Sequence, residues 1–344
     1  MSSIKRINNE PVIQGGFNLI KKQLKLSAKI EKLEATIRRL VKDFPKRQEM
    51  QEELAKSYAG YKGELSLDYY FNLLPTNDYF FLHNLRLPNS NGNHFFQMDI
   101  VLLTPFYFLI IEVKNIAGTL TFDPVFDQLI WTTPEKEIAL PDPVRQVKNQ
   151  KYQLIEWLKL KRFPLLPVET IVVLSNPQTI IKINSIKKEY IDRIIRSTRF
   201  ISKIEDFKRH YTKELISTKD INKISNLLIK QHTPAVPDFF ERFNIQKSEL
   251  LTGVFCENCS MFTMQYHWGE WICKRCSFTN KDGHLDALRD FALLYQPTIT
   301  NRQLRDFLHL PNSDSAYYLL QSMSLQHTGG YKGRKYYLPP VELD

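Results

Sequence analysis

Residues 97–118 read QMDIVLLTPFYFLIIEVKNIAG, and this stretch decides the fold expected for the chain. It contains two apolar runs, 100–103 and 107–111, that are too short for helices and rich in β-branched and aromatic residues. Pro105 lies between the two runs, where proline favours a turn. The stretch therefore predicts two antiparallel strands joined by a tight turn.

The register of this hairpin brings charged side chains together. If the turn is centred on residues 105–106, paired numbers sum to a constant, so Asp99 lies opposite Glu112 and Gln97 lies opposite Lys114. Glu112 and Lys114 are two residues apart, so they share one face of their strand. Opposed β-carbons are about 5 Å apart. We therefore expect a cluster of charged side chains at the end of the hairpin far from the turn.

Two carboxylates this close repel each other unless a cation lies between them. A hard divalent ion such as Mg²⁺ prefers oxygen ligands, keeps several waters and accepts phosphate oxygens. A lysine beside the ion can orient a water molecule or stabilise developing negative charge. The cluster therefore predicts a site for phosphodiester hydrolysis. The alternative interpretation is a strand end with ordinary charged side chains and no catalytic role.

The order of Asp99, an apolar strand and Glu112-Val-Lys114 resembles the motif of the restriction-endonuclease-like superfamily. That motif is an Asp, then an Asp or Glu, any residue, and Lys. Within the superfamily, about residues 55–180 are most similar to the nuclease-related domain family, called NERD. Ile100 departs from the family pattern, which often has His after the Asp, but both acidic positions are kept.

Three further elements support the resemblance to NERD. The family has a Gly-Glu pair in an upstream helix, which is matched by Gly63-Glu64. It has a polar residue shortly before the Asp, matched by Gln97, and a Pro-x-x-Gln element that opens a downstream helix, matched by residues 143–146. The resemblance implies a restriction-endonuclease-like α/β core and a nuclease that acts on nucleic acid, DNA more than RNA.

The resemblance also implies roles for individual residues. Glu64, Asp99 and Glu112 would hold a catalytic Mg²⁺ or Mn²⁺, Lys114 would assist the attacking water, and Gln146 would orient water or phosphate. Taken without the resemblance, Glu64 is typical of a solvent-facing helix residue, and the glutamines at 146, 150 and 153 are typical of a solvated helix face.

Composition and length set bounds on the class of protein. The chain has 344 residues, enough for two or three domains. Its formal net charge of +10 favours an anionic partner such as nucleic acid. The opening residues 1–9 are polar with no apolar core after them, which is not typical of a signal peptide. The longest apolar run is far too short for a membrane span. We therefore expect a cytoplasmic protein without a membrane partner.

The N-terminal part predicts a short unstructured lead over residues 1–16 and a helix over 17–44, ended by Pro45. Apolar residues of this helix recur at three- and four-residue steps, as in a coiled coil. The helix is either an arm that forms a homodimer or tracks along DNA, or a helix packed on its own nuclease domain. Further along, residues 168–175 form a β-branched run typical of a buried strand, so the core is expected to hold a mixed sheet.

All four cysteines lie in two Cys-x-x-Cys pairs, Cys256 with Cys259 and Cys273 with Cys276, separated by thirteen residues. Two such pairs supply four thiolates for one tetrahedral Zn²⁺. Because all four positions would be protein ligands, the zinc is expected to be structural, within a zinc ribbon. Disulfide bonds are the alternative, which a cytoplasmic location disfavours.

Residues 283–338 predict three helices followed by a hairpin with glycines and cations, the pattern of a winged helix-turn-helix. The third helix carries few cations, so protein binding stays an alternative to DNA binding. The expected domains are a helical arm (1–54), the nuclease domain (55–232), the zinc ribbon (238–281) and the winged helix (282–344). The alternative function is a non-catalytic nucleic-acid-binding or scaffolding protein that retains a nuclease fold.

Overall fold

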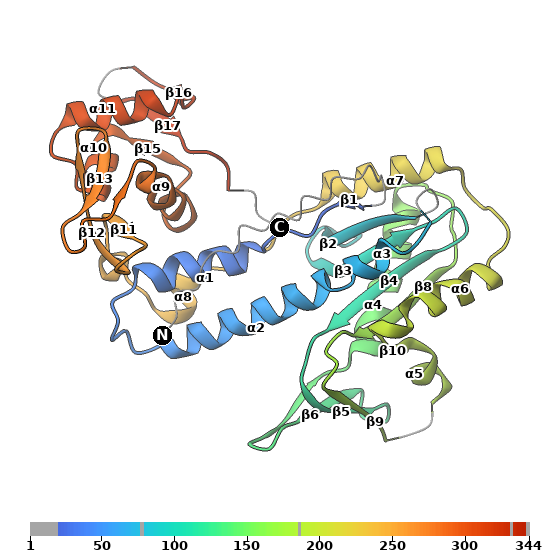
Figure 1. Cartoon of the computed structure of the whole chain (residues 1–344). Coiled ribbons are helices and arrows are strands. Elements are labelled where there is room, and N and C mark those ends of the chain that lie inside the picture. Colours follow the sequence, from blue (N-terminus) through green and yellow to red (C-terminus); the bar gives the residue numbers. More distant parts are fainter. Residues whose placement is uncertain (1–19, 76–78, 185–186, 331–332, 342–344) are drawn as a thin grey trace. The chain divides into compact units, whose positions relative to one another are not determined.

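The computed structural model describes residues 20–75, 79–184, 187–330 and 333–341 (Figure 1). Over these residues the chain is a mixed α/β protein that forms two compact units. One unit contains Lys56–Ala235 together with residues 20–26, and the other combines Ser27–Ala55 with the chain from residue 236 onward. The lead expected over residues 1–16 lies outside the described residues. The expected division into four domains stays a prediction.

The first unit is built on a six-stranded mixed sheet of order β1-β2-β3-β4-β8-β10. Strands β2, β3 and β4 are antiparallel neighbours, whereas β8 runs parallel to both β4 and β10. Both the expected mixed sheet and the expected strand over residues 168–175 are therefore confirmed. The strands are β1 (Ile20–Lys22), β2 (Phe80–Pro88), β3 (Phe95–Leu103), β4 (Phe108–Lys114), β8 (Val168–Leu174) and β10 (Ile194–Arg196).

The hairpin of β3 and β4 has the register expected from the sequence. Ile100 pairs with Ile111, and the ladder continues in step to Leu103. At the turn, the Thr104 amide donates to the Tyr107 carbonyl at 3.2 Å. The Thr104 hydroxyl is buried within the turn and donates to the same carbonyl. This tight closure fixes which residues face each other along the whole hairpin.

Helices cover both faces of this sheet. Helices α4 (Pro143–Leu160) and α7 (Thr218–Gln231) pack on one face, and α3 (Asp68–Phe71) and α6 (Phe200–His210) pack on the other. Side chains alternate along β4, and those of Phe108 and Ile110 enter the core under α4. The side chains at 112 and 114 therefore also belong to the α4 face.

A second, smaller sheet of order β7-β6-β5-β9 extends the first unit. Strands β5 and β6 form an antiparallel hairpin within it. Helix α2 is a single long helix that ends at Leu65. The remaining elements are α2 (Arg47–Leu65), β5 (Gly118–Asp123), β6 (Gln128–Thr132), β7 (Glu137–Pro141), β9 (Thr179–Ile183), α5 (Lys188–Arg193) and the 3-10 helix Ser197–Arg199.

The second unit contains a four-stranded sheet, β11-β12-β13-β14, and a three-stranded sheet, β15-β17-β16. The three helices α9, α10 and α11 and the β16–β17 hairpin follow in the expected order, and strand β15, between α9 and α10, was not expected. The elements are α1 (Ala28–Arg39), α8 (Phe239–Phe243), the 3-10 helix Lys247–Glu249, β11 (Val254–Cys256), β12 (Met261–His267), β13 (Glu270–Cys273), β14 (Thr279–Asn280), α9 (Gly283–Leu294), β15 (Thr298–Thr300), α10 (Asn301–Leu308), α11 (Ser313–Ser322), β16 (His327–Thr328) and β17 (Lys335–Tyr337).

The single helix expected over residues 17–44 is wrong in its first part. Residues 20–22 form strand β1 on the edge of the main sheet, and α1 begins only after Ser27, whose hydroxyl accepts from the Ile30 amide. Strand pairing and this N-cap determine where the helix begins, although apolar residues at three- and four-residue steps continue further toward the N-terminus. Residues 17–19 lie outside the described part of the chain.

The apolar side of α1 is buried within the second unit, where α1 packs against α9. Of the two arrangements considered for this helix, neither describes it, because it packs on the C-terminal elements of its own unit. Because its apolar stripe is already covered, the stripe does not support the expected homodimer. Within the described residues, no helix has both the length and the hydropathy needed to cross a membrane.

Arg39, the last residue of α1, is fully buried and anchors the helix to the second unit. Its Nε donates to Asp290 Oδ2 at 2.9 Å, and its Nη1 donates to the Leu251 carbonyl at 2.9 Å. The guanidinium also lies over the rings of Phe262 and Phe307, at 4.9 and 4.6 Å from their centroids. Burial raises the pKa of Asp290, and the charges of Arg38 and Arg39 oppose that rise.

We expect removal of one partner of this pair to be strongly destabilising. Asp290→Ala leaves the buried guanidinium without its counter-ion, which costs about 3–5 kcal/mol in the free energy of unfolding. The exposed pair of Asp220 and Lys223 is the control, because breaking it costs less than about 1 kcal/mol. Urea unfolding of the two variants measures the difference. Equal stability of Asp290→Ala and Asp220→Ala would contradict the anchoring role.

Candidate functional site

The candidate site lies where β3 and β4 separate. Their pairing ends at Ile100 with Ile111, whereas β4 continues alongside β8 as far as Lys114 and Leu174. The Asp99 carboxylate spans the opening, because its Oδ2 accepts from the Val113 amide at 2.9 Å. The polar side chains of β4 therefore face a widened end of the sheet.

An irregularity in β2 accompanies this opening. Asn84 has a left-handed backbone, with φ of 48°, and lies opposite Asp99 between the pairs His83 with Ile100 and Leu85 with Met98. The Asn84 side chain accepts from Gln97 Nε2 at 2.6 Å. The regular pairing of β3 with β4 ends before these positions, so the placement of Gln97 opposite Lys114 stays a prediction.

Glu112 is the most buried acidic residue of the cluster, with 2% of its surface exposed. Lys114 Nζ contacts its Oε1 at 2.5 Å, and Gln150 Nε2 donates to its Oε2 at 3.0 Å. Gln150 also donates to the Gln97 carbonyl at 2.9 Å, which ties α4 to β3. Both oxygens of Glu112 are therefore engaged.

Sequence reasoning missed Gln150, because a row of glutamines is typical of a solvated face. In the structure its side chain is buried. The signal that would have found it is its position one helical turn after Gln146, which puts both side chains on one face of α4.

The start of α4 fixes Gln146. Asp142 caps the helix by accepting from the Val144 amide at 2.8 Å, and Pro143 occupies the first helical turn, where its fixed φ is favourable. Tyr190 donates to the other oxygen of Asp142. Gln146 Oε1 then lies 3.5 Å from Lys114 Nζ. The Pro-x-x-Gln element therefore brings an amide to the cluster.

Gly63 brings α2 close to the ends of β4 and β8. A β-carbon at this position would lie 2.5 Å from Asn115 Cβ and 3.0 Å from Ser175 Oγ. Asn115 also donates to the Ala59 carbonyl of α2 at 2.8 Å. The neighbouring Glu64 is near enough to the cluster that its charge helps to raise the pKa of Lys114. Within the Gly-Glu pair, Gly63 thus allows the helix to pack closely, and Glu64 adds a third acidic residue near the cluster.

The charged groups of the cluster shift one another's pKa values. Desolvation and the charge of Glu112 raise the pKa of Asp99 to about 7. Burial alone would lower the pKa of Lys114, but the charges of Glu112 and Asp99 raise it above its ordinary value. Lys114 is therefore an ammonium at neutral pH, able to stabilise negative charge but not to remove a proton from water.

The donor set suits a hard divalent ion, since it consists of carboxylate and amide oxygens. Desolvation, the larger cause, and the charge of Glu112 raise the pKa of Asp99, and a bound cation would favour its ionised form. Among the residues that the structure describes, however, only one group of three or more His, Cys, Asp or Glu side chains lies close enough to share one ion, and it is the cysteine cluster. Glu64, Asp99 and Glu112 therefore do not form a preassembled three-carboxylate site.

The four cysteines do come together. Their Sγ atoms all lie within 4.8 Å of one another, and both Cys256–Cys276 and Cys259–Cys273 are 3.6 Å apart. A tetrahedral site with Zn–S bonds of about 2.3 Å needs sulfur separations of about 3.8 Å. A disulfide needs about 2 Å. The arrangement fits zinc and not disulfide bonds.

Comparison with known proteins gives one family. Residues 59–175 match the family described as nuclease-related domain, NERD. The matched segment contains Glu64, Asp99, Glu112, Lys114 and Gln146. No curated protein and no solved structure matches the chain.

We expect Gly63→Ala to damage the site through packing. The added methyl group meets Asn115 and Ser175, so the helix must shift, at a cost of about 1–3 kcal/mol. Gly60→Ala is the matched control on the same helix, where nothing lies within 4 Å, and it should stabilise by about 0.5–1 kcal/mol. Thermal unfolding of both variants measures the contrast. Two variants of equal stability would show that α2 is not closely packed at Gly63.

We expect the purified protein to hold one zinc ion per chain, lost on Cys273→Ser. Because structural zinc supplies about 10–16 kcal/mol of apparent binding free energy, the cysteine-bearing sheet should then become sensitive to protease. Elemental analysis and limited proteolysis measure the two effects. A strong chelator should reproduce the proteolysis pattern in the wild type. Metal-free protein with two disulfides would refute the assignment.

Proposed function

We propose that the chain is a Mg²⁺-dependent nuclease that hydrolyses phosphodiester bonds of nucleic acid, and we infer DNA as its substrate from the family resemblance. The observation that carries the proposal is the meeting of Asp99, Glu112 and Lys114 at the open sheet end of a nuclease-related domain. Binding alone does not need two neighbouring carboxylates beside a phosphate, whereas hydrolysis through a metal does.

Asp99 and Glu112 would hold the metal, with Glu64 as a third acidic residue. Mg²⁺ is commonly bound by one or two carboxylates plus waters and substrate phosphates, so a preassembled third ligand is not required. When bound, the ion supplies an activated water and stabilises the charge on the phosphate. To bind this ion, Glu112 must share or release the oxygen that contacts Lys114.

Lys114 would then serve the phosphate. Its ammonium stabilises the negative charge that develops on the phosphate oxygens as water attacks. Gln146 Oε1 lies within reach of that ammonium and can hold either Lys114 or the attacking water in place. Gln150 fixes the orientation of Glu112 through the oxygen that Lys114 does not contact.

The remaining modules would hold the nucleic acid. We assign the α/β core to the restriction-endonuclease-like type, the cysteine-bearing sheet to a structural zinc ribbon, and the elements from α9 to β17 to a winged helix-turn-helix. In the last of these, Tyr317 and Tyr318 of α11 are exposed, and aromatic rings stack on bases. The net charge of +10 supports an anionic partner.

A second candidate is a nucleic-acid-binding or scaffolding protein that does not cleave. The observation that favours it is the contact of Lys114 with Glu112, which compensates the buried carboxylate without any metal. Under this alternative the protein binds nucleic acid with a steep salt dependence but leaves it intact in both Mg²⁺ and Mn²⁺.

We expect the wild type to nick supercoiled plasmid in Mg²⁺ and not in EDTA. Asp99→Ala and Lys114→Ala should each lower the rate by about 100-fold or more, the scale of losing one group that stabilises a charged transition state. Asp220→Ala and Lys223→Ala change the same residue types at exposed positions of α7 and serve as controls. Nicking that survives at wild-type rates in the two site variants would favour the second candidate and point to a contaminant.

A further inference from the structure

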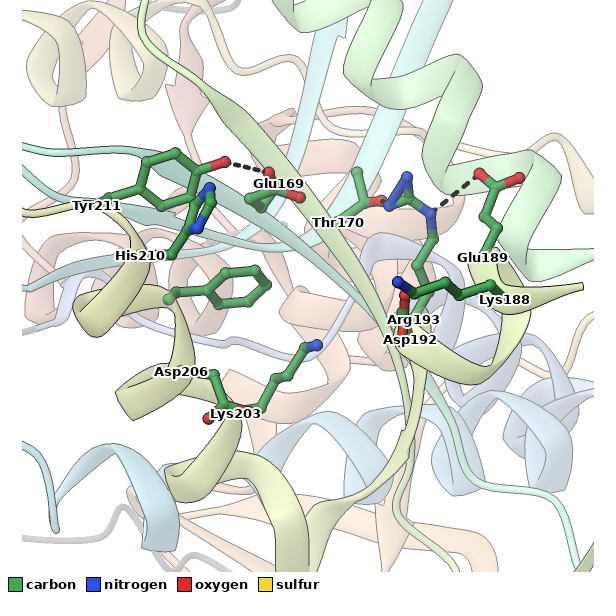
Figure 2. A pocket seen from close by; sticks show the side chains of 11 residues that line it. Glu169, Thr170, Lys188, Glu189, Asp192, Arg193, Lys203, Asp206, His210 and Tyr211 are labelled. Carbon is green, nitrogen blue, oxygen red and sulfur yellow. Dashed lines mark hydrogen bonds and ion pairs between the residues drawn. The ribbon is translucent and has the colours of Figure 1, made fainter.

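A cavity lies in the first unit, away from the candidate site. Figure 2 shows it between α5 and α6, with β8 at its back, and its volume is about 610 Å³. Cavities of about 300–1,000 Å³ hold small-molecule ligands. The cavity borders Glu169 and Thr170, where β8 pairs with β4 on one side only, because β10 covers β8 only from Val172 onward. The missing length of β10 leaves this space.

Several acidic groups of the cavity wall are already paired. The Tyr211 hydroxyl donates to Glu169, and Glu189 contacts both Lys148 and Arg193. The same Arg193 donates from Nη1 to Thr170 Oγ1 at 2.9 Å, which holds its guanidinium against the wall. These contacts hold the back of the cavity in place.

Two cations of the wall have no such partner. Within the described residues, Lys188 of α5 and Lys203 of α6 make no ion pair, and Figure 2 shows them reaching into the cavity from opposite sides. Lys203 Nζ lies over the ring of Phe207, 5.1 Å from its centroid. His210 also borders the space, whereas Asp192 is an acidic group of the wall without an ion pair there. Asp206 also borders the cavity, and its carboxylate pairs with Arg209. Beyond the paired acidic groups, the cavity thus offers two cations, aromatic rings and the carboxylate of Asp192.

We propose that this cavity binds a nucleoside phosphate, either as a free nucleotide or as the phosphorylated end of a nucleic-acid strand. The phosphate lies between Lys188, Lys203 and the fixed guanidinium of Arg193. The base contacts the rings of Phe207 and Tyr211, and Asp192 accepts from a ribose hydroxyl or a base amino group. Inorganic phosphate would satisfy only the cations, and an apolar ligand would satisfy only the rings.

This site is independent of the proposed nuclease centre. None of Asp99, Glu112, Lys114 and Gln146 lines the cavity. Glu112 pairs with Val172, two residues from Thr170 of the cavity wall, but β4 lies on the opposite edge of β8 from β10 and the cavity. A ligand in the cavity therefore does not occupy the position of a scissile phosphate. The proposal stands whether or not the chain cleaves nucleic acid.

The test is isothermal titration of the full-length Asp99→Ala protein, which removes cleavage from the measurement. The probes are AMP, inorganic phosphate, and a short oligonucleotide with and without a 5′-phosphate. We expect saturable binding of AMP or of the phosphorylated oligonucleotide, and much weaker binding of inorganic phosphate. AMP binding alone identifies a free nucleotide as the source, and binding that needs the 5′-phosphate of the oligonucleotide identifies a strand end.

Charge reversal locates the binding. Lys203→Glu should weaken binding about tenfold or more, whereas Lys208→Glu, an exposed residue of the same helix outside the cavity, should change it less than about twofold. Lys188→Glu provides a second variant on the opposite wall if Lys203→Glu fails to fold by circular dichroism. Equal weakening by Lys203→Glu and Lys208→Glu would overturn the proposal, as would inorganic phosphate binding as tightly as AMP, or no binding by any probe.

Discussion

The buried carboxylate of Glu112 is the constraint on which the arrangement around the candidate site depends. A carboxylate with 2% of its surface exposed must be neutralised and hydrogen-bonded, or it costs several kcal/mol. Lys114 and Gln150 meet this need from two different elements, β4 and α4. The position of α4 on the sheet is thereby tied to the chemistry of the strand end. The same contacts leave Asp99 as the group whose negative charge is least compensated.

The opening between β3 and β4 makes room for the polar side chains around Glu112. A continuous ladder would have placed backbone hydrogen bonds where the polar side chains now lie. Instead the Asp99 carboxylate accepts the Val113 amide and takes over one such bond. Asn84 accommodates the change on the next strand with a left-handed backbone, a conformation that asparagine adopts more readily than most other residues.

Local patterns predicted those parts of the structure that local forces determine. The register of the hairpin follows from one turn and two short apolar runs, and the Pro-x-x-Gln element follows from helix capping. The cysteine spacing likewise brought four sulfurs together over a short segment. In each case the partners are near in sequence, so few alternatives compete.

Contacts between distant segments were beyond such patterns. Gln150 resembled a solvated residue because its partner, Glu112, is remote in sequence, and the end of the β3–β4 ladder depends on the third strand, β2. The apolar residues of α1 resembled a coiled coil, because their spacing in the sequence does not show which part of the protein covers them. Its cover is α9, roughly 250 residues away, and the decisive contact is the ion pair of Arg39 with Asp290.

Strand β8 lies next to both the acidic cluster and the cavity. Its last residues lie beside Glu112 and Lys114 in the sheet, and its first residues form the back of the cavity under α5 and α6. Because β10 covers only the end nearest the acidic cluster, one strand is closed at that end and open at the other. A bound group at the open edge would contact α5 and α6 without touching the carboxylates. The short length of β10 therefore leaves room for a cavity with unpaired lysines on the edge of β8 that faces away from the acidic cluster.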